Sequence, residues 1–116
     1  WRVIAVERSP SSVADARHNL VDLDARVVRS KVERFSAPSA DLVIADPSRA
    51  GLGRDGVAVV TAADPERIVL VSCDAASAGR DVGLLDTAGW SPTRSIVVDL
   101  FPHTHHVEVV TVLDRF

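Results

Sequence analysis

Acidic side chains and a thiol stand at the ends of short apolar runs, where they are placed to contact a ligand. Glu7, Asp46 and Cys73 each follow such a run, and Glu108 lies near the start of another. A thiolate is a nucleophile, and a carboxylate can accept a proton. Ligands of open α/β sheets bind outside the carboxyl ends of the parallel strands. If the runs are strands of one such sheet, these four groups converge at a single edge.

Each group also has an ordinary structural explanation. A carboxylate after a strand often caps a turn or a helix, which would suffice for Glu7. A lone cysteine after an apolar strand is commonly an inert buried residue, and Glu108 would simply be exposed. His103, His105 and His106 do not match a recognised spacing of metal ligands, so we expect no metal in this segment.

The apolar runs predict the strands that position these groups. Runs without polar alternation, bounded by turn residues, are typical of a parallel sheet. Four runs have this character: residues 3–6, 26–28, 42–45 and 68–71. Because helical stretches separate some of them, the sequence predicts an α/β fold with a doubly wound, mainly parallel sheet.

Three helices are expected between the strands. The first begins at Ser9-Pro10, which supplies an N-cap and a first helical residue. A weaker helix is predicted between residues 56 and 63, and a longer one over 75–88. Gly89 is placed as the residue after the end of the longer helix.

The C-terminal residues break this alternation. Residues 95–100 and 107–113 both have strand character, and only six residues separate them. A parallel crossover needs roughly a dozen or more residues, so we predict that these two strands are antiparallel. The beginning of the last strand then lies at the carboxyl edge of the parallel strands, which brings Glu108 to the edge that carries Cys73.

Composition limits the class of protein. The 116 residues carry a formal charge of −3, 47% hydrophobic residues and one cysteine. This size allows one domain with one core. No apolar run approaches the ~20 residues of a membrane span, and the N-terminus lacks the pattern of a signal peptide. A single cysteine excludes an internal disulfide and a four-cysteine metal site, so we expect a cytoplasmic protein.

The first residues already belong to an apolar run. Residues 3–6 have the character of a buried strand, and the chain has no methionine to serve as an initiator. We therefore expect the chain to be a piece of a longer protein.

Four segments together indicate a family. They are residues 6–10, 46–52 (DPSRAGL), 71–81 (beginning VSCD) and 99–108 (ending FPHTHHVE). In order and spacing they resemble the C-terminal catalytic part of the RNA uracil-5-methyltransferases, which use S-adenosylmethionine to make 5-methyluridine in tRNA and 23S rRNA. The resemblance covers nearly the whole chain. It implies that residues 1–116 are the C-terminal part of an incomplete class I (Rossmann-like) methyltransferase domain.

The resemblance also implies roles for individual residues. Glu7 would bind the ribose hydroxyls of S-adenosylmethionine, and Asp46 would lie beside this cofactor. Cys73 would be the nucleophile that attacks the uracil ring, and Glu108 the general base. Arg49 matches a position that contacts the RNA substrate or has a structural role, and the same two roles are open for Asp81.

The predicted helix after Cys73 bears on its reactivity. A helix N-terminus favours a thiolate because the positive end of the helix dipole lies there. Asp74 opposes a thiolate at Cys73 unless its carboxylate caps the helix.

Some residues depart from the family pattern. Lys31 stands where the family commonly has Asp or Asn near the adenine, and lysine cannot accept a hydrogen bond from an amino group. Ser48 replaces a second proline, and His103 replaces a glutamine.

The family's first strand and its glycine-rich cofactor turn would precede Trp1. In the family this strand lies between the strands that correspond to residues 3–6 and 42–45. We therefore expect the isolated chain to bind S-adenosylmethionine poorly and to be inactive alone. A charge of −3 also disfavours contact with phosphates, so the main RNA contacts are expected upstream.

Two other functions remain open from the sequence. Methyltransferases acting on exocyclic amines stack an aromatic ring on the base, but the corresponding position here is Arg49. The chain would alternatively be a non-catalytic Rossmann-like scaffold or an RNA or protein interaction module. In that case Cys73 and Glu108 would have no chemical role.

Overall fold

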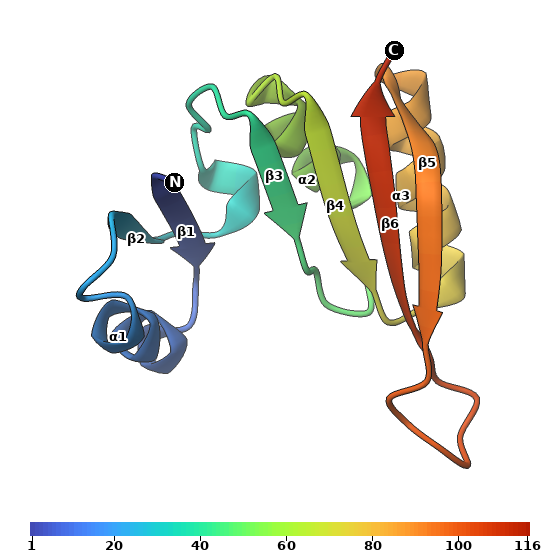
Figure 1. Cartoon of the computed structure of the whole chain (residues 1–116), viewed down its shortest axis with the longest axis horizontal. Helices are drawn as coiled ribbons and strands as arrows, with labels where there is room; N and C mark the ends of the chain where they lie inside the picture. Colours follow the sequence, from blue (N-terminus) through green and yellow to red (C-terminus); the bar gives the residue numbers. More distant parts are fainter. The chain divides into compact units, whose positions relative to one another are not determined.

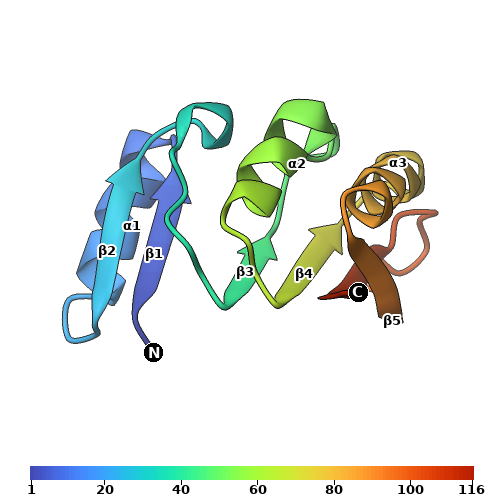
Figure 2. The same ribbon diagram turned by 90° about the horizontal axis from the view of Figure 1, so that it is seen from above.

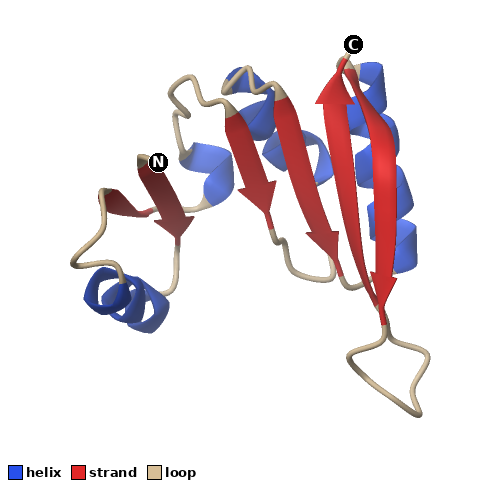
Figure 3. Cartoon of the chain, in the orientation of Figure 1, coloured by secondary structure: helices blue, strands red, loops and turns tan.

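The structure, a computed structural model, describes residues 1–116 and divides them into two units. Unit 1 comprises Trp1–Ser36 and unit 2 comprises Ala37–Phe116. Strands and helices alternate along the chain until the last helix, after which two strands follow each other (Figure 3). No helix has both the length and the apolar character needed to cross a membrane.

Unit 1 is a β-α-β motif followed by one turn of 3₁₀ helix. Its elements are β1 (Val3–Glu7), α1 (Pro10–Asn19), β2 (Ala25–Arg29) and η1 (Val32–Arg34). The two strands are parallel, as predicted. α1 starts at Pro10 with Ser9 as the N-cap, because proline has no N–H to leave unpaired at a first helical position. The 3₁₀ turn was not predicted.

Unit 2 contains a four-stranded sheet with two helices. Its strands are β3 (Leu42–Ala45), β4 (Arg67–Ser72), β5 (Trp90–Val98) and β6 (Glu108–Arg115), in the order β3-β4-β6-β5. β3 and β4 are parallel, whereas β6 is antiparallel to β4 and to β5. The predicted antiparallel C-terminal strand is therefore confirmed, and it lies between β4 and β5 (Figure 1).

The core of unit 2 lies between this sheet and its two helices. These are α2 (Gly53–Ala62) and α3 (Ala75–Thr87), and both lie on the same side of β3 and β4 (Figure 2). The buried cluster draws on both helices and three strands: Val57, Val60, Ile68, Leu70, Leu85, Trp90 and Leu113. On the opposite face of the sheet, Ile44 is 67% exposed.

The start of β5 differs from the prediction. The strand begins at Trp90, five residues before the predicted start at 95, and includes Pro92. Proline cannot donate to a ladder, but it is tolerated on an edge strand or at an irregularity. β5 is an edge strand, and its register shifts between Pro92 and Arg94. Trp90 is buried, and its Nε1 donates to the Pro65 carbonyl at 2.8 Å.

The strands form two separate hydrogen-bonded sheets. β1 pairs only with β2, and β3 pairs only with β4, so each of these two strands has one unpaired edge. In the family that the sequence resembles, a further strand lies between the strands that correspond to β1 and β3, and such a strand stays a prediction here.

Candidate active site

The carboxyl edge of the four-stranded sheet carries a thiol and two carboxylates. Asp46 follows β3, Cys73 follows β4, and Glu108 is the first residue of β6. Because β6 is antiparallel to β4, its first residue lies at the edge where β3 and β4 end (Figure 1). Asp46 is exposed and its side chain has no hydrogen-bond partner, which leaves both oxygens open to a ligand.

The strand register brings Cys73 and Glu108 to neighbouring backbone positions. The last pair between β4 and β6 is Ser72 with Val109. Continuing this register by one residue sets Cys73 opposite Glu108. Residues directly opposite in an antiparallel pair have Cβ atoms about 5 Å apart and share one face. The arrangement suits two groups that act on the same ring.

The side chain of Glu108 points away from the helices. Thr111 and Leu113 on the same strand are buried under α2 and α3. Side chains alternate along a strand, so Glu108 lies on the opposite face. It is half-buried, as is Cys73, and both are therefore within reach of a ligand.

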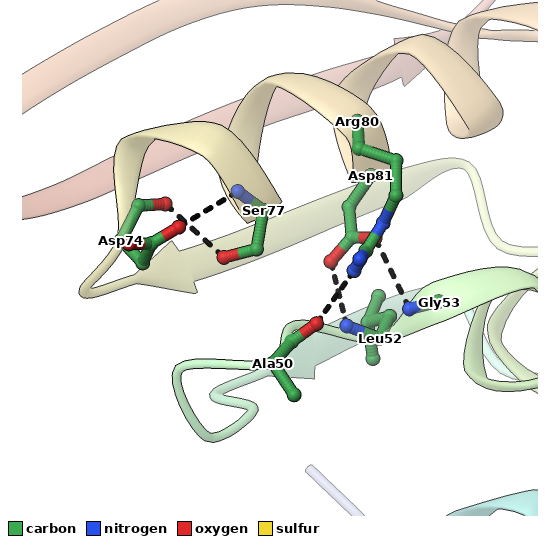
Figure 4. A network of polar contacts seen from close by, with 7 residues as sticks. All are labelled: Ala50, Leu52, Gly53, Asp74, Ser77, Arg80 and Asp81. Carbon is green, nitrogen blue, oxygen red and sulfur yellow. Dashed lines mark hydrogen bonds and ion pairs between the residues drawn. The ribbon is translucent and has the colours of Figure 1, made fainter.

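Asp74 caps the helix that follows Cys73. Its Oδ1 accepts a hydrogen bond from the Ser77 backbone N–H at 2.9 Å, and the Ser77 hydroxyl donates to the Asp74 carbonyl at 3.2 Å (Figure 4). Hydrogen bonding of the carboxylate to the backbone and side chain of Ser77 lowers the pKa of Asp74, with smaller contributions from the Ala76 N–H and the charge of Arg49, while desolvation acts in the opposite direction. The sequence left open whether Asp74 opposes a thiolate or caps the helix, and the structure shows the cap.

Asp81 holds the loop between β3 and α2 against α3. This carboxylate is 1% exposed. It accepts hydrogen bonds from the N–H groups of Leu52 and Gly53 at 2.6 and 3.1 Å (Figure 4). Arg80 donates to the same carboxylate at 2.8 Å and to the Ala50 carbonyl at 2.6 Å. Of the two roles open for Asp81, its contacts support the structural one.

Gly51 is required where this loop approaches α3. Its φ of +75° lies in the left-handed region, which side chains other than glycine rarely adopt. A Cβ atom there would clash most closely with Asp81 Oδ2, and would lie 2.6 Å from Arg80 Nη2 and 3.1 Å from Ser77 Cβ. A larger residue would therefore strain the loop and displace the side chains of Asp81 and Arg80.

We expect Gly51→Ala to lower the free energy of unfolding of unit 2 by about 2 kcal/mol, because it adds backbone strain and a steric clash. Gly79→Ala is the matched control, since Gly79 lies inside α3 and a Cβ there meets nothing within 4 Å. Replacing a glycine inside a helix with alanine raises the free energy of unfolding by roughly 0.5 to 1 kcal/mol. Urea unfolding of both variants checks this, and equal midpoints would contradict the strained loop.

Arg49 contacts a histidine 57 residues further along the chain. Its Nη2 lies 3.2 Å from both Nδ1 and Nε2 of His106. Partial burial, the charge of Arg49 and, to a lesser extent, the charge of His105 lower the pKa of His106 below 6.5, while Asp74 acts in the opposite direction. No pattern in the sequence indicated this contact.

Glu7 in unit 1 stabilises the turn that leads into α1. Its Oε1 accepts a hydrogen bond from the Ser9 N–H at 2.7 Å, directly before α1. Oε2 has no partner within the chain and stays open to a ligand. An open depression lies beside this turn, lined by Arg8, Ser9, Pro10, Arg29, Ser30 and Lys31. One carboxylate oxygen of Glu7 thus has the structural role expected from the sequence, and the other oxygen is free.

Two of the histidines near Glu108 lie against each other. The rings of His105 and His106 stack with their centroids 4.1 Å apart. No group of three or more His, Cys, Asp or Glu side chains in the structure is arranged to hold a metal ion.

A family model described as tRNA (uracil-5-)-methyltransferase matches residues 29–116. Among curated relatives, an uncharacterized RNA methyltransferase of Streptomyces coelicolor is 39% identical over 117 residues. One of Porphyromonas gingivalis is 38% identical over 127 residues. The alignments cover 97% and 98% of this chain, but only 26% and 27% of the relatives. The chain therefore spans about a quarter of the length of these proteins.

Solved structures agree with the family match. The tRNA (uracil-54, C5)-methyltransferase of Pyrococcus abyssi, solved with S-adenosyl-L-homocysteine, superposes with a TM-score of 0.86 and 33% identity. The superposition covers 97% of this chain and 29% of that one. The N-methyltransferase NodS of Bradyrhizobium japonicum has a TM-score of 0.80 at 13% identity, covers 98% of this chain and 66% of its own, and shows the fold alone.

These neighbours confirm the predicted partial Rossmann-like fold with parallel strands and an antiparallel C-terminal strand. The match over residues 29–116 shows that this chain belongs to the tRNA (uracil-5-)-methyltransferase family.

Proposed function

We propose that the protein containing this chain transfers a methyl group from S-adenosylmethionine to carbon 5 of a uridine in tRNA or rRNA. The observation that carries the proposal is the register that sets Cys73 opposite Glu108, at the edge where β3 and β4 end. The family membership supports the RNA substrate.

The activity is assigned to a protein of the relatives' length. We propose that residues 1–116 are the C-terminal part of its catalytic domain and call this longer protein the full-length enzyme. We do not assign activity to the isolated chain. Further RNA contacts are assigned to the rest of the full-length enzyme, because this chain carries a net charge of −3.

The residues of unit 1 fit part of S-adenosylmethionine. The free Oε2 of Glu7 is an acceptor, which suits the hydroxyls of a ribose. Lys31 lines the nearby depression but offers only donors, so no contact with the adenine amino group is assigned to it. Asp46 is proposed as a second residue near the cofactor. When bound, the cofactor would supply an electrophilic methyl group. The S-adenosyl-L-homocysteine in the Pyrococcus abyssi enzyme supports this choice.

Cys73 and Glu108 are proposed to act in sequence on the uracil ring. The Cys73 thiolate adds to carbon 6, and the electron pair of the 5,6 double bond moves to make carbon 5 enolate-like and nucleophilic. Once carbon 5 carries the methyl group, Glu108 removes the remaining proton from that carbon. The 5,6 double bond reforms, the carbon–sulfur bond breaks, and the thiolate leaves. Arg49, exposed at the same edge, is proposed to contact the RNA with the donors that His106 does not use.

Release of tritium tests this function. RNA labelled with tritium on carbon 5 of its uridines should lose one tritium to water for each methyl group that the full-length enzyme transfers. Label on carbon 6 should be retained. Offering tRNA and rRNA separately identifies the substrate. Methyl transfer without tritium release would indicate methylation of an exocyclic amine, and no transfer to either RNA would indicate a non-catalytic module.

A further inference from the structure

The loop between β5 and β6, residues 99–107, extends beyond the ends of these strands (Figure 1). Its hydrogen bonds are otherwise local, such as Thr104 N–H to the Phe101 carbonyl at 3.2 Å and His106 N–H to the Thr104 hydroxyl at 3.2 Å. The contact between Arg49 and His106 is the one hydrogen bond that joins this loop to another part of unit 2.

The same contact involves a residue close in the sequence to Glu108, one of the two proposed reacting residues. His106 precedes Glu108 by two residues, at the point where β6 begins. Asp74 directly follows Cys73 and begins α3 as its N-cap. Arg49 itself comes from the loop after β3. The side chain of Arg49 therefore joins the loop after β3 to the segment that leads into β6.

We propose that Arg49 and neutral His106 form a bridge that holds the start of β6, and with it Glu108, in position to remove the proton from carbon 5. Arg49 and His106 are then positioning residues for the release step, and they act through Glu108. This inference rests on the proposed function and adds two residues to it.

The bridge depends on the charge of His106. A guanidinium is a cation that has donors only, and a protonated imidazole is a second cation without an acceptor, so protonation of His106 would turn this contact into repulsion between two positive charges. The charged groups that face His106 are Arg49, His105 and Asp74. Partial burial and the charges of Arg49 and His105 hold the pKa of His106 below 6.5. The ring is therefore neutral and the bridge intact at neutral pH. It is lost as the pH falls through that lowered value.

Variants of the full-length enzyme test the bridge. His106→Ala removes the acceptor. His106→Gln keeps an acceptor that does not titrate. Arg54→Ala is the control, because Arg54 is an exposed arginine of α2 without a side-chain partner. Two rates are measured: tritium release from carbon 5, and formation of the covalent adduct with RNA containing 5-fluorouridine. Formation of the adduct requires every step before proton removal. Its rate therefore measures those steps, and its presence also shows that the variant is folded.

We expect His106→Ala to slow tritium release at pH 8 about tenfold, which corresponds to about 1.4 kcal/mol, while adduct formation changes less than about twofold. His106→Gln should keep most of the release rate at pH 8. Its release rate should stay constant as the pH falls through the lowered pKa of His106, whereas the rate of the natural enzyme should decline there. Arg49→Ala should slow tritium release at least as much as His106→Ala, and its adduct formation should fall too, because Arg49 is also proposed to contact the RNA. Adding His106→Ala to Arg49→Ala should slow release little further.

Two results would overturn the bridge while leaving the proposed function in place: natural release rates in His106→Ala, or an unchanged acid decline in His106→Gln. Absence of both adduct and tritium release in the natural enzyme would instead overturn the proposed function.

Discussion

Replacing Cys73 with alanine in the full-length enzyme should abolish the covalent adduct with RNA that contains 5-fluorouridine. Fluorine on carbon 5 cannot leave as a proton does, so Glu108 cannot complete the reaction and the bond from sulfur to carbon 6 persists. Alanine offers no atom that forms this bond. We expect the adduct to fall at least about a thousandfold, as for the loss of other enzymatic nucleophiles. A denaturing gel that resolves protein from protein–RNA adduct measures it.

Ser72→Ala is the matched control for Cys73→Ala. Ser72 is the preceding residue, and its buried side chain points to the helix-covered face of β4. Loss of one heavy atom there tests whether any small change at the end of β4 disturbs the site. The control should retain the adduct. An undiminished adduct in Cys73→Ala would reject Cys73 as the nucleophile.

The strands and helices were predictable where short-range patterns determine them. The apolar run of β3 has the bounds 42–45 in both the prediction and the structure. Gly89 follows α3 with a φ of +112°, as expected for the residue after a helix end. The antiparallel pairing of β5 and β6 followed from the short distance between them in the sequence, because a parallel crossover cannot be that short.

Edge effects limited the prediction of β5. Trp90 to Arg94 includes a proline and polar residues, which argue against a strand when sequence alone is considered. The structure accommodates them because β5 has a free edge and a shifted register at Pro92. Whether a strand lies at an edge depends on the pairing of the whole sheet, and a local pattern does not contain that information.

The position of Glu108 could be predicted from the sequence, but the contacts between loops near it could not. Strand direction alone places Glu108 at the edge that carries Cys73, and the observed register agrees. The contact between Arg49 and His106, by contrast, joins two loops separated by 57 residues. Loop conformations depend on tertiary contacts such as those of Asp81 with Leu52 and Gly53. A single sequence gives no spacing rule for such contacts.

Glu108→Gln should separate methyl transfer from release in the full-length enzyme. Glutamine has nearly the same shape as glutamate, but its amide does not accept a proton at neutral pH. Cys73 can still add to carbon 6, so one methyl group per enzyme should be transferred to ordinary RNA. The proton on carbon 5 then stays, and the covalent complex accumulates. We expect turnover to fall by about 10² to 10⁴, the usual contribution of a general base.

Multiple-turnover methylation and a denaturing gel with unmodified RNA measure the two effects. Glu66→Gln is the control, because Glu66 is an exposed glutamate next to β4 whose side chain has no partner. Normal multiple turnover by Glu108→Gln would exclude Glu108 as the essential base. In the double variant Cys73→Ala, Glu108→Gln, no complex should form at all. Glu108 acts only on an adduct that Cys73 has already made, so removing the nucleophile must erase the effect of removing the base.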